Sequence, residues 1–264
     1  KTLFPYTTLF RSLNQALGHQ GQTQLGGGVT GANINMTAGQ IITYFANVAS
    51  AATQVNTTRN SYYAVGTTVT GSNFTSSISF PDSISNYGFA TSRTVTFAGG
   101  ANAARYFFNA GGRIQLVLTA TNNNGTARSA DIVNLFQSWL GGSIIYDANS
   151  AARTGTGGTL NTSNTAAGYY TLTTTPTILA NVSSNAAAYR YQTDWARIQV
   201  NTNGTQGTTG DQGTTITFTM GTGVAAQVNS NFNDAVNVTL TSRVDIILPE
   251  TVYLANVWGV IGVS

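Results

Sequence analysis

Few residues in this sequence could carry acid–base or metal chemistry: one histidine, eight carboxylates and no cysteine. His19 lies in a Gly/Gln-rich stretch, and a Ser/His/Asp triad or a histidine zinc site needs an imidazole held rigidly beside its partners. The absence of cysteine excludes thiolate zinc sites, iron–sulfur clusters, cysteine nucleophiles and disulfides. Most hydrolase and metal sites therefore lack their usual side chains here.

The carboxylates leave one enzyme class open, because a glycosidase needs only two of them on facing strands. They are scattered, and no pair stands out. Asp211, in TTGDQG, comes nearest to a calcium-type turn, but a hairpin turn is the simpler interpretation. We expect no catalytic residue, no metal site and no cofactor, and we predict that the protein is not an enzyme. The eight acids are Asp82, Asp131, Asp147, Asp194, Asp211, Asp234, Asp245 and Glu250.

The composition predicts a folded protein with an uncharged surface. Hydrophobic residues make up 41% of the chain, enough to fill a core, whereas charged residues make up only 7%, against about 25% in average soluble proteins. Without Lys1 and Arg11 the net charge falls from +3 to +1, and the other arginines do not cluster. We therefore expect no nucleic-acid partner. No apolar run reaches the ~18 residues that would span a bilayer, so no membrane association is expected.

The first 60 residues differ in sequence pattern from the rest of the chain. Residues 2–12, TLFPYTTLFRS, resemble the conceptual translation of a short-read sequencing adapter, and we exclude residues 1–12 from fold reasoning as an artefact. Residues 13–33 are Gly/Gln-rich and predict a loop or linker. Between Met36 and Arg59, apolar residues recur at three- and four-residue spacing, which predicts an amphipathic helix with Thr37 as its N-cap. Residues 13–60 form this leader and helix.

Residues 61–264 have the pattern of a β domain. Short alternating segments are separated by Asn/Gly/Thr-rich spacers, as in sandwiches and barrels. One helix is expected between them, at Ser129–Leu140, with Ser129 as N-cap and Gly141/Gly142 as its end. The predicted fold is mainly β: an antiparallel β-sandwich with an N-terminal amphipathic helix and one short inserted helix. The expected strands are 92–97, 113–121, 142–147, 168–174, 177–182, 194–201, 214–220 and 236–248.

Aromatic side chains offer one route to binding, because an exposed ring can stack on a sugar. The candidates are the pairs Tyr62/Tyr63, in SYY, and Tyr169/Tyr170, in GYY, with Trp195 and Trp258. Of these, Tyr62, Tyr169 and Trp195 are the expected sugar contacts. Adjacent tyrosines in a strand point to opposite faces, so one of each pair should be in the core.

The segment TVTFAGGANAARYFFNAGGRIQLVLTATN is the most specific part of the chain. Glycine pairs permit sharp turns at both ends. Between them, Tyr106, Phe107 and Phe108 supply apolar bulk, and Arg105 can cap or stack nearby. The motif residues, to which we give a structural role, are Arg105, Tyr106, Phe107, Phe108, Asn109, Gly111 and Gly112.

This segment resembles a recurrent stretch in uncharacterised virion and tail structural proteins of tailed phages, especially marine and cyanobacterial myoviruses. The similarity covers about residues 90–248; the strand start Arg113-Ile-Gln-Leu departs from the usual pattern, so no ionic role is carried over to it. The resemblance implies a structural protein of the virion, extracellular, in a tail, tail fibre or baseplate.

The expected partners are other virion proteins, further copies of this chain in a homo-oligomer, and a host surface glycan. Two alternatives remain open: a bacterial surface adhesin or carbohydrate-binding module, and a glycan-cleaving tail enzyme.

Overall fold

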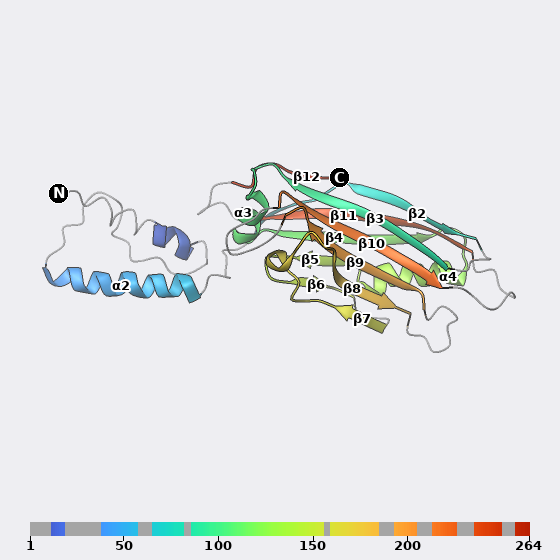
Figure 1. Cartoon of the computed structure of the whole chain (residues 1–264), viewed down its shortest axis with the longest axis horizontal. Coiled ribbons are helices and arrows are strands. Elements are labelled where there is room, and N and C mark those ends of the chain that lie inside the picture. Colours follow the sequence, from blue (N-terminus) through green and yellow to red (C-terminus); the bar gives the residue numbers. More distant parts are fainter. Residues whose placement is uncertain are drawn as a thin grey trace.

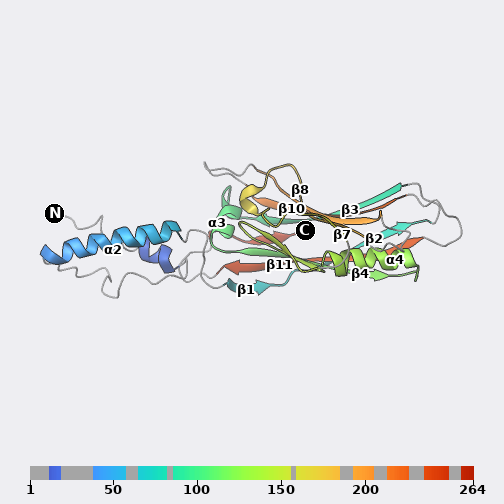
Figure 2. The ribbon, with the colours of Figure 1, turned by 90° about the horizontal axis from the view of Figure 1, so that it is seen from below.

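The computed structural model describes residues 12–18, 38–57, 65–81, 86–155, 159–184, 193–204, 213–225, 235–249 and 257–264. Its regular structure is mainly β, with two antiparallel sheets. Sheet A has the order β1-β11-β4-β5-β6, with β2 also paired to β11, and sheet B has the order β12-β3-β10-β9-β8-β7. In Figure 2 the two sheets form separate layers, with β3, β8 and β10 in one and β1, β4 and β11 in the other.

The strands of sheet A are β1 (Val65–Val69), β2 (Asn73–Phe80), β4 (Arg113–Asn122), β5 (Ser143–Tyr146), β6 (Ala151–Arg153) and β11 (Val236–Pro249). The strands of sheet B are β3 (Asn86–Phe97), β7 (Thr159–Ser163), β8 (Thr177–Ser183), β9 (Trp195–Thr202), β10 (Thr215–Ala225) and β12 (Ile261–Val263). The helices are a short helix over 12–18, α2 (Ala38–Thr57), α3 (Ala103–Asn109), α4 (Ala127–Asn134), a π-helix (Leu135–Trp139) and a 3-10 helix (Tyr169–Thr171).

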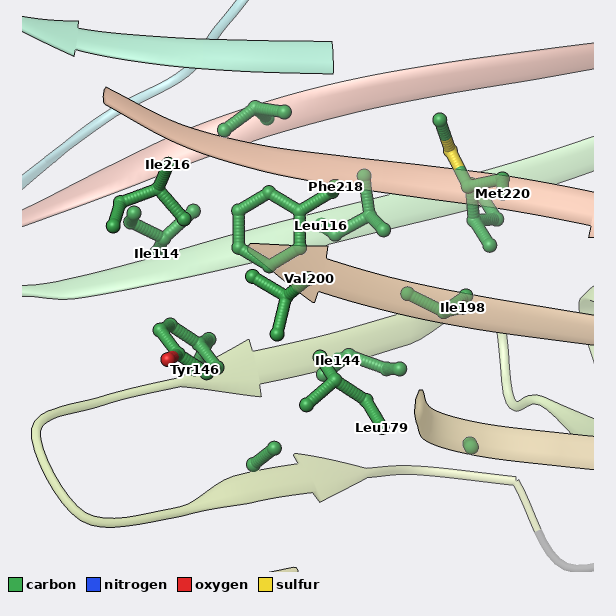
Figure 3. Close-up of a cluster of buried hydrophobic side chains, with 14 of the residues drawn as sticks. Ile114, Leu116, Ile144, Tyr146, Leu179, Ile198, Val200, Ile216, Phe218 and Met220 are labelled. Carbon is green, nitrogen blue, oxygen red and sulfur yellow. The ribbon is translucent and has the colours of Figure 1, made fainter. Parts of the chain in front are cut away.

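A single hydrophobic core fills the space between the sheets. Strict alternation produces it: in β4, Ile114, Leu116 and Leu118 are buried while the residues between them are more exposed, because successive side chains in a strand point to opposite faces. Figure 3 shows the two layers meeting, with side chains of β4 and β5 opposite those of β8, β9 and β10. The labelled residues there are Ile114, Leu116, Ile144, Tyr146, Leu179, Ile198, Val200, Ile216, Phe218 and Met220.

Strands β1 and β2 follow the same edge of β11 with a break between them. β1 pairs with residues 246–249 and β2 with residues 236–243. At the break, a Cβ on Gly71 would lie 2.0 Å from the carbonyl oxygen of Val244, so only glycine fits. The Gly71 N–H donates to Asp245 Oδ1 at 2.9 Å, and Asp245 also forms a bidentate pair with Arg243. The hydrogen bond from Gly71 to Asp245 therefore attaches the connection between β1 and β2 to β11.

The expected helix at 129–140 is present, but it begins and ends differently. α4 starts at Ala127, and its N-cap is Thr126, whose Oγ1 accepts from the Ser129 N–H at 3.2 Å. The prediction of Ser129 as N-cap was therefore wrong by one turn. The last turn widens into the π-helix Leu135–Trp139, and Gly141 and Gly142, with φ of 95° and 65°, end it as expected.

Two other predictions were wrong. The segment 168–174 is not a strand: it contains the 3-10 helix Tyr169–Thr171, because the N–H groups of Tyr169 and Tyr170 donate to the carbonyls of Asp147 and Ala148 instead of to a neighbouring strand. In addition, a second helix, α3, is inserted between β3 and β4, where only a compact connection was expected.

The N-terminal region contains helices in both of its described parts. Residues 12–18, expected as the end of the artefact and the start of a loop, are helical, with Leu13 and Leu17 buried. Both views place this helix beside α2 (Figures 1 and 2). α2 spans the region where the amphipathic helix was expected. The side chains before Asn47 and the expected cap Thr37 lie outside the described residues, as does the domain boundary at residue 60, so the amphipathic face stays a prediction.

Candidate functional site

The RYFFNAGG motif lies at one end of the two sheets, opposite the end occupied by α4 (Figures 1 and 2). α3 buries one stripe, Ala103, Ala104, Phe107 and Phe108, because positions three and four apart share a helix face. Phe108 stacks on Tyr169 with ring centres 4.6 Å apart and planes 16° from parallel. We call the connected rings the aromatic cluster: Phe97, Phe107, Phe108, Tyr146, Tyr169, Phe218 and Trp258.

The other motif residues surround this cluster without entering it. Tyr106, expected to supply apolar bulk beside the two phenylalanines, is 43% exposed because it lies off the buried stripe of α3. Arg105 is partly buried and Asn109 is exposed. Gly111 has a φ of 91°, and a Cβ on Gly112 would lie 2.5 Å from the Phe107 ring. The glycines thus let the chain turn tightly around a buried phenylalanine.

At the opposite end, α4 contributes to a buried ionic cluster that the sequence did not reveal. Arg128 donates from Nε to Asp194 Oδ2 at 2.9 Å and from Nη2 to Asp194 Oδ1 at 2.8 Å. Their side chains are only 3% and 0% exposed. The Ser184 N–H donates to the Asp194 carbonyl at 3.3 Å, so the end of β8 and the start of β9 are joined at the same point.

Asp131, one turn after Arg128, is the second carboxylate of this ionic cluster. Burial, followed by the charge of Asp194, raises its pKa from 3.8 to about 7, and the Ser184 hydroxyl and the charge of Arg128 act in the opposite direction. Asp131 is 3% exposed. A buried carboxyl with a raised pKa beside a second carboxylate also occurs in acid–base pairs, but here both are covered by protein and Asp194 is held by Arg128. The arrangement therefore fits a structural ion-pair cluster.

A second group of polar residues surrounds Arg93 of β3, which is buried between the sheets. Its Nε donates to Ser242 Oγ at 2.7 Å, and its guanidinium lies 4.6 Å from the centre of the Phe74 ring. Its Nη atoms donate to the Thr91 hydroxyl, the Ser92 carbonyl and the Ser76 hydroxyl. Burial lowers the pKa of Arg93. Hydroxyl and carbonyl oxygens thus solvate this cation and link β3 to β2 and β11.

The outer face of sheet B contains one of the three expected sugar contacts. Trp195 is partly exposed there, and Arg197 lies over it with its Cζ 4.5 Å from the ring centre. Tyr169 and Trp258 are buried in the aromatic cluster, so their rings are not open to a sugar, whereas Tyr170 is 44% exposed. One tyrosine of this pair is thus in the core as expected, although the reason was a helical turn and not strand alternation. Tyr62 lies outside the described residues.

The described residues contain no group of three or more His, Asp or Glu side chains that could hold a metal ion. His19 and Asp211 are not among them. Within the same described ranges, no helix is both long and apolar enough to cross a membrane.

The fold and these clusters define a mainly β protein in which two antiparallel sheets enclose one core, with packed clusters at its two ends. Comparison of the chain with protein-family models, with curated proteins and with solved structures gives no match.

Proposed function

We propose that this chain is a structural, non-enzymatic component of a bacteriophage particle, located in its tail, tail fibre or baseplate. One observation carries the proposal. The RYFFNAGG segment, on which the resemblance to phage tail proteins rests, contributes Phe107 and Phe108 to the aromatic cluster. The part of the sequence that resembles tail proteins thus has a packing role, as a structural protein requires.

The two sheets and their shared core support an antiparallel β-sandwich, preceded by an amphipathic helix. Its surface would carry hydroxyl and amide groups in place of charges, since only 7% of the residues are charged. Such a surface suits a rigid extracellular particle, in which the chain contacts other virion proteins and further copies of itself.

Mass spectrometry of purified particles tests the proposal. Tailed phages from a sample containing this gene are separated on a density gradient, and each fraction is digested. Peptides of this chain should follow the major capsid protein across the gradient. Their presence in bacterial envelope fractions instead, and not in particle fractions, would contradict the proposal.

The part-exposed Trp195 beside Arg197 favours a second candidate, a bacterial surface adhesin or carbohydrate-binding module. Envelope fractionation separates the two candidates, because only the adhesin would remain with cells free of phage. The homo-oligomer is tested by light scattering on the purified chain. A strictly monomeric protein at micromolar concentration would contradict that part of the proposal.

A further inference from the structure

Two glycines interrupt β10, a central strand of sheet B, where residues with side chains are favoured. Glycine in a strand interior costs about 0.5–1 kcal/mol relative to alanine, and it often marks a place where something approaches the backbone closely. Here that group is an indole: a Cβ on Gly223 would lie 2.4 Å from ring atoms of Trp195, and one on Gly221 3.8 Å from the ring. The glycines therefore let the Trp195 ring lie directly on the backbone of β10.

Arg197 holds its guanidinium against this ring, with its Cζ 4.5 Å from the ring centre. A stacked guanidinium keeps its N–H donors at its edges, where they match both oxygens of a carboxylate. Among the described residues of this outer face, Arg197 is the one charged side chain, and the described ion pairs, Arg128–Asp194 and Arg243–Asp245, lie elsewhere. The face thus presents a positive charge that takes part in neither of these two ion pairs.

The surroundings of Trp195 are flat and rich in hydroxyl groups. Gly88 and Ala90 of β3 lie opposite Gly223 and Gly221, so the surface beside the indole is low. Further along the same face, Ser92 Oγ and Thr219 Oγ1 are 2.9 Å apart, and Thr94 Oγ1 and Thr217 Oγ1 are 3.1 Å apart. Hydroxyls can both donate and accept, as sugar hydroxyls do. We call this surface the Trp195 face: Gly88, Ala90, Ser92, Trp195, Arg197, Thr219, Gly221 and Gly223.

We propose that the Trp195 face binds a carboxylate-bearing sugar of a surface polysaccharide. Arg197, held in place by the Trp195 indole beneath it, would pair with the carboxylate through the edge of its guanidinium, and the Ser92 and Thr219 hydroxyls would bond the hydroxyl groups of the sugar. This inference rests on the proposed function, because it needs the chain to be outside a cell and facing a host surface. The Arg128–Asp194 pair supports the geometry, since Asp194 directly precedes Trp195 and anchors the start of β9.

Calorimetry with two probes of the same chain length tests the proposal: oligogalacturonate, and the same oligomer with every carboxylate methyl-esterified. Sialic-acid oligomers and their methyl esters form a second pair. The full chain should bind at least one acidic probe, and its affinity for the ester should be weaker by about tenfold or more, the loss expected for a charge-assisted hydrogen bond. Arg197→Gln should weaken acidic binding by a similar factor, and Arg197→Lys should give an intermediate value because it keeps the charge but loses the planar donors.

The matched control is Arg105→Gln, which removes the same charge from α3, at the end of the two sheets opposite α4 (Figure 1). It should leave binding unchanged, and thermal unfolding of each variant shows that the fold is kept. Three results would overturn the inference: no binding to either acidic probe, equal binding of acid and ester, or equal losses for Arg197→Gln and Arg105→Gln. Failure here leaves the particle assignment untouched, because mass spectrometry of virions tests that separately.

Discussion

Arg128 and Asp194 form a bidentate ion pair across 66 residues of sequence, with donor–acceptor distances of 2.9 and 2.8 Å and almost no solvent exposure. The pair ties α4 to the start of β9. A buried pair contributes less than its Coulomb energy suggests, because both ions lose their hydration. Removing one partner is costly, however, because the other charge remains buried without compensation.

The first prediction is that Asp194→Asn destabilises the protein by about 3–5 kcal/mol. Urea unfolding, followed by tryptophan fluorescence, measures the change. The double variant Arg128→Met/Asp194→Leu removes both charges and should recover most of the loss. A change of less than about 1 kcal/mol for Asp194→Asn, typical of an exposed pair, would contradict the structural role given to this pair.

The second prediction concerns pH and Asp131, whose pKa is raised from 3.8 to about 7 by burial and by the charge of Asp194. The folded protein therefore holds this proton more tightly than the unfolded chain does. The contribution of Asp131 to the free energy of unfolding should fall as the pH rises from 3.8 to about 7, and it should be level above that range.

Asp131→Asn isolates this contribution, because asparagine has a similar shape and does not titrate. The variant should gain stability relative to the wild type as the pH rises through this range, by about 1.4 kcal/mol per unit of pKa shift. Denaturant midpoints at several pH values provide the measurement. Parallel stability curves for the two proteins would show that Asp131 has an ordinary pKa.

The third prediction concerns the close contact between the Trp195 ring and Gly223. Gly223→Ala should destabilise the protein by about 1–3 kcal/mol, the cost of overpacking, because the new Cβ would lie 2.4 Å from the Trp195 ring. Gly88→Ala on the paired position of β3 is the control: nothing lies within 4 Å of its Cβ, so it should be neutral or slightly stabilising. In the Trp195→Ala background, Gly223→Ala should lose its cost. If Gly223→Ala destabilises the Trp195→Ala protein as much as the wild type, the contact with the indole is not the cause of the loss.

The fourth prediction separates two neighbours in the RYFFNAGG motif. Phe108→Ala should cost about 3–5 kcal/mol, since it removes a buried ring that contacts Phe107, Tyr146 and Tyr169. Tyr106→Ala should change stability by less than about 0.5 kcal/mol, because Tyr106 is 43% exposed. Calorimetric unfolding of both variants provides the comparison. Similar losses of stability for the two variants would contradict the orientation of α3 in which Phe108 is buried and Tyr106 is exposed.

Local pattern accounted for most of the strands. The alternation of Ile114, Leu116 and Leu118 places β4 correctly, because a period of two follows directly from strand geometry. The same logic failed at Tyr169, where β-favouring residues form a helical turn. The N–H groups of this turn donate to the carbonyls of Asp147 and Ala148. These two residues lie about twenty positions earlier in the chain, so no local sequence pattern includes them. Helix α3 was missed because seven residues rich in aromatics do not differ clearly from a strand or a loop.

The candidate sites depended more strongly on tertiary contacts. Trp195 was recognisable as a possible sugar contact from its type alone, but the glycines beneath it and Arg197 above it acquire meaning only from the pairing of β9 with β10. Asp131 and Asp194 were two of eight scattered acids until folding placed both beside Arg128.

The sequence by itself determined the mainly β character, the positions of the principal strands and the uncharged composition, because alternation and composition are local properties of a chain. Tertiary structure decided which residues became neighbours: Phe108 with Tyr169, Arg128 with Asp194, and Trp195 with Gly223. The order of strands in a sheet and the packing of helices against its ends depend on how the whole chain buries its apolar surface. Contacts that carry buried charge, stacked rings and surface sites follow from that long-range arrangement.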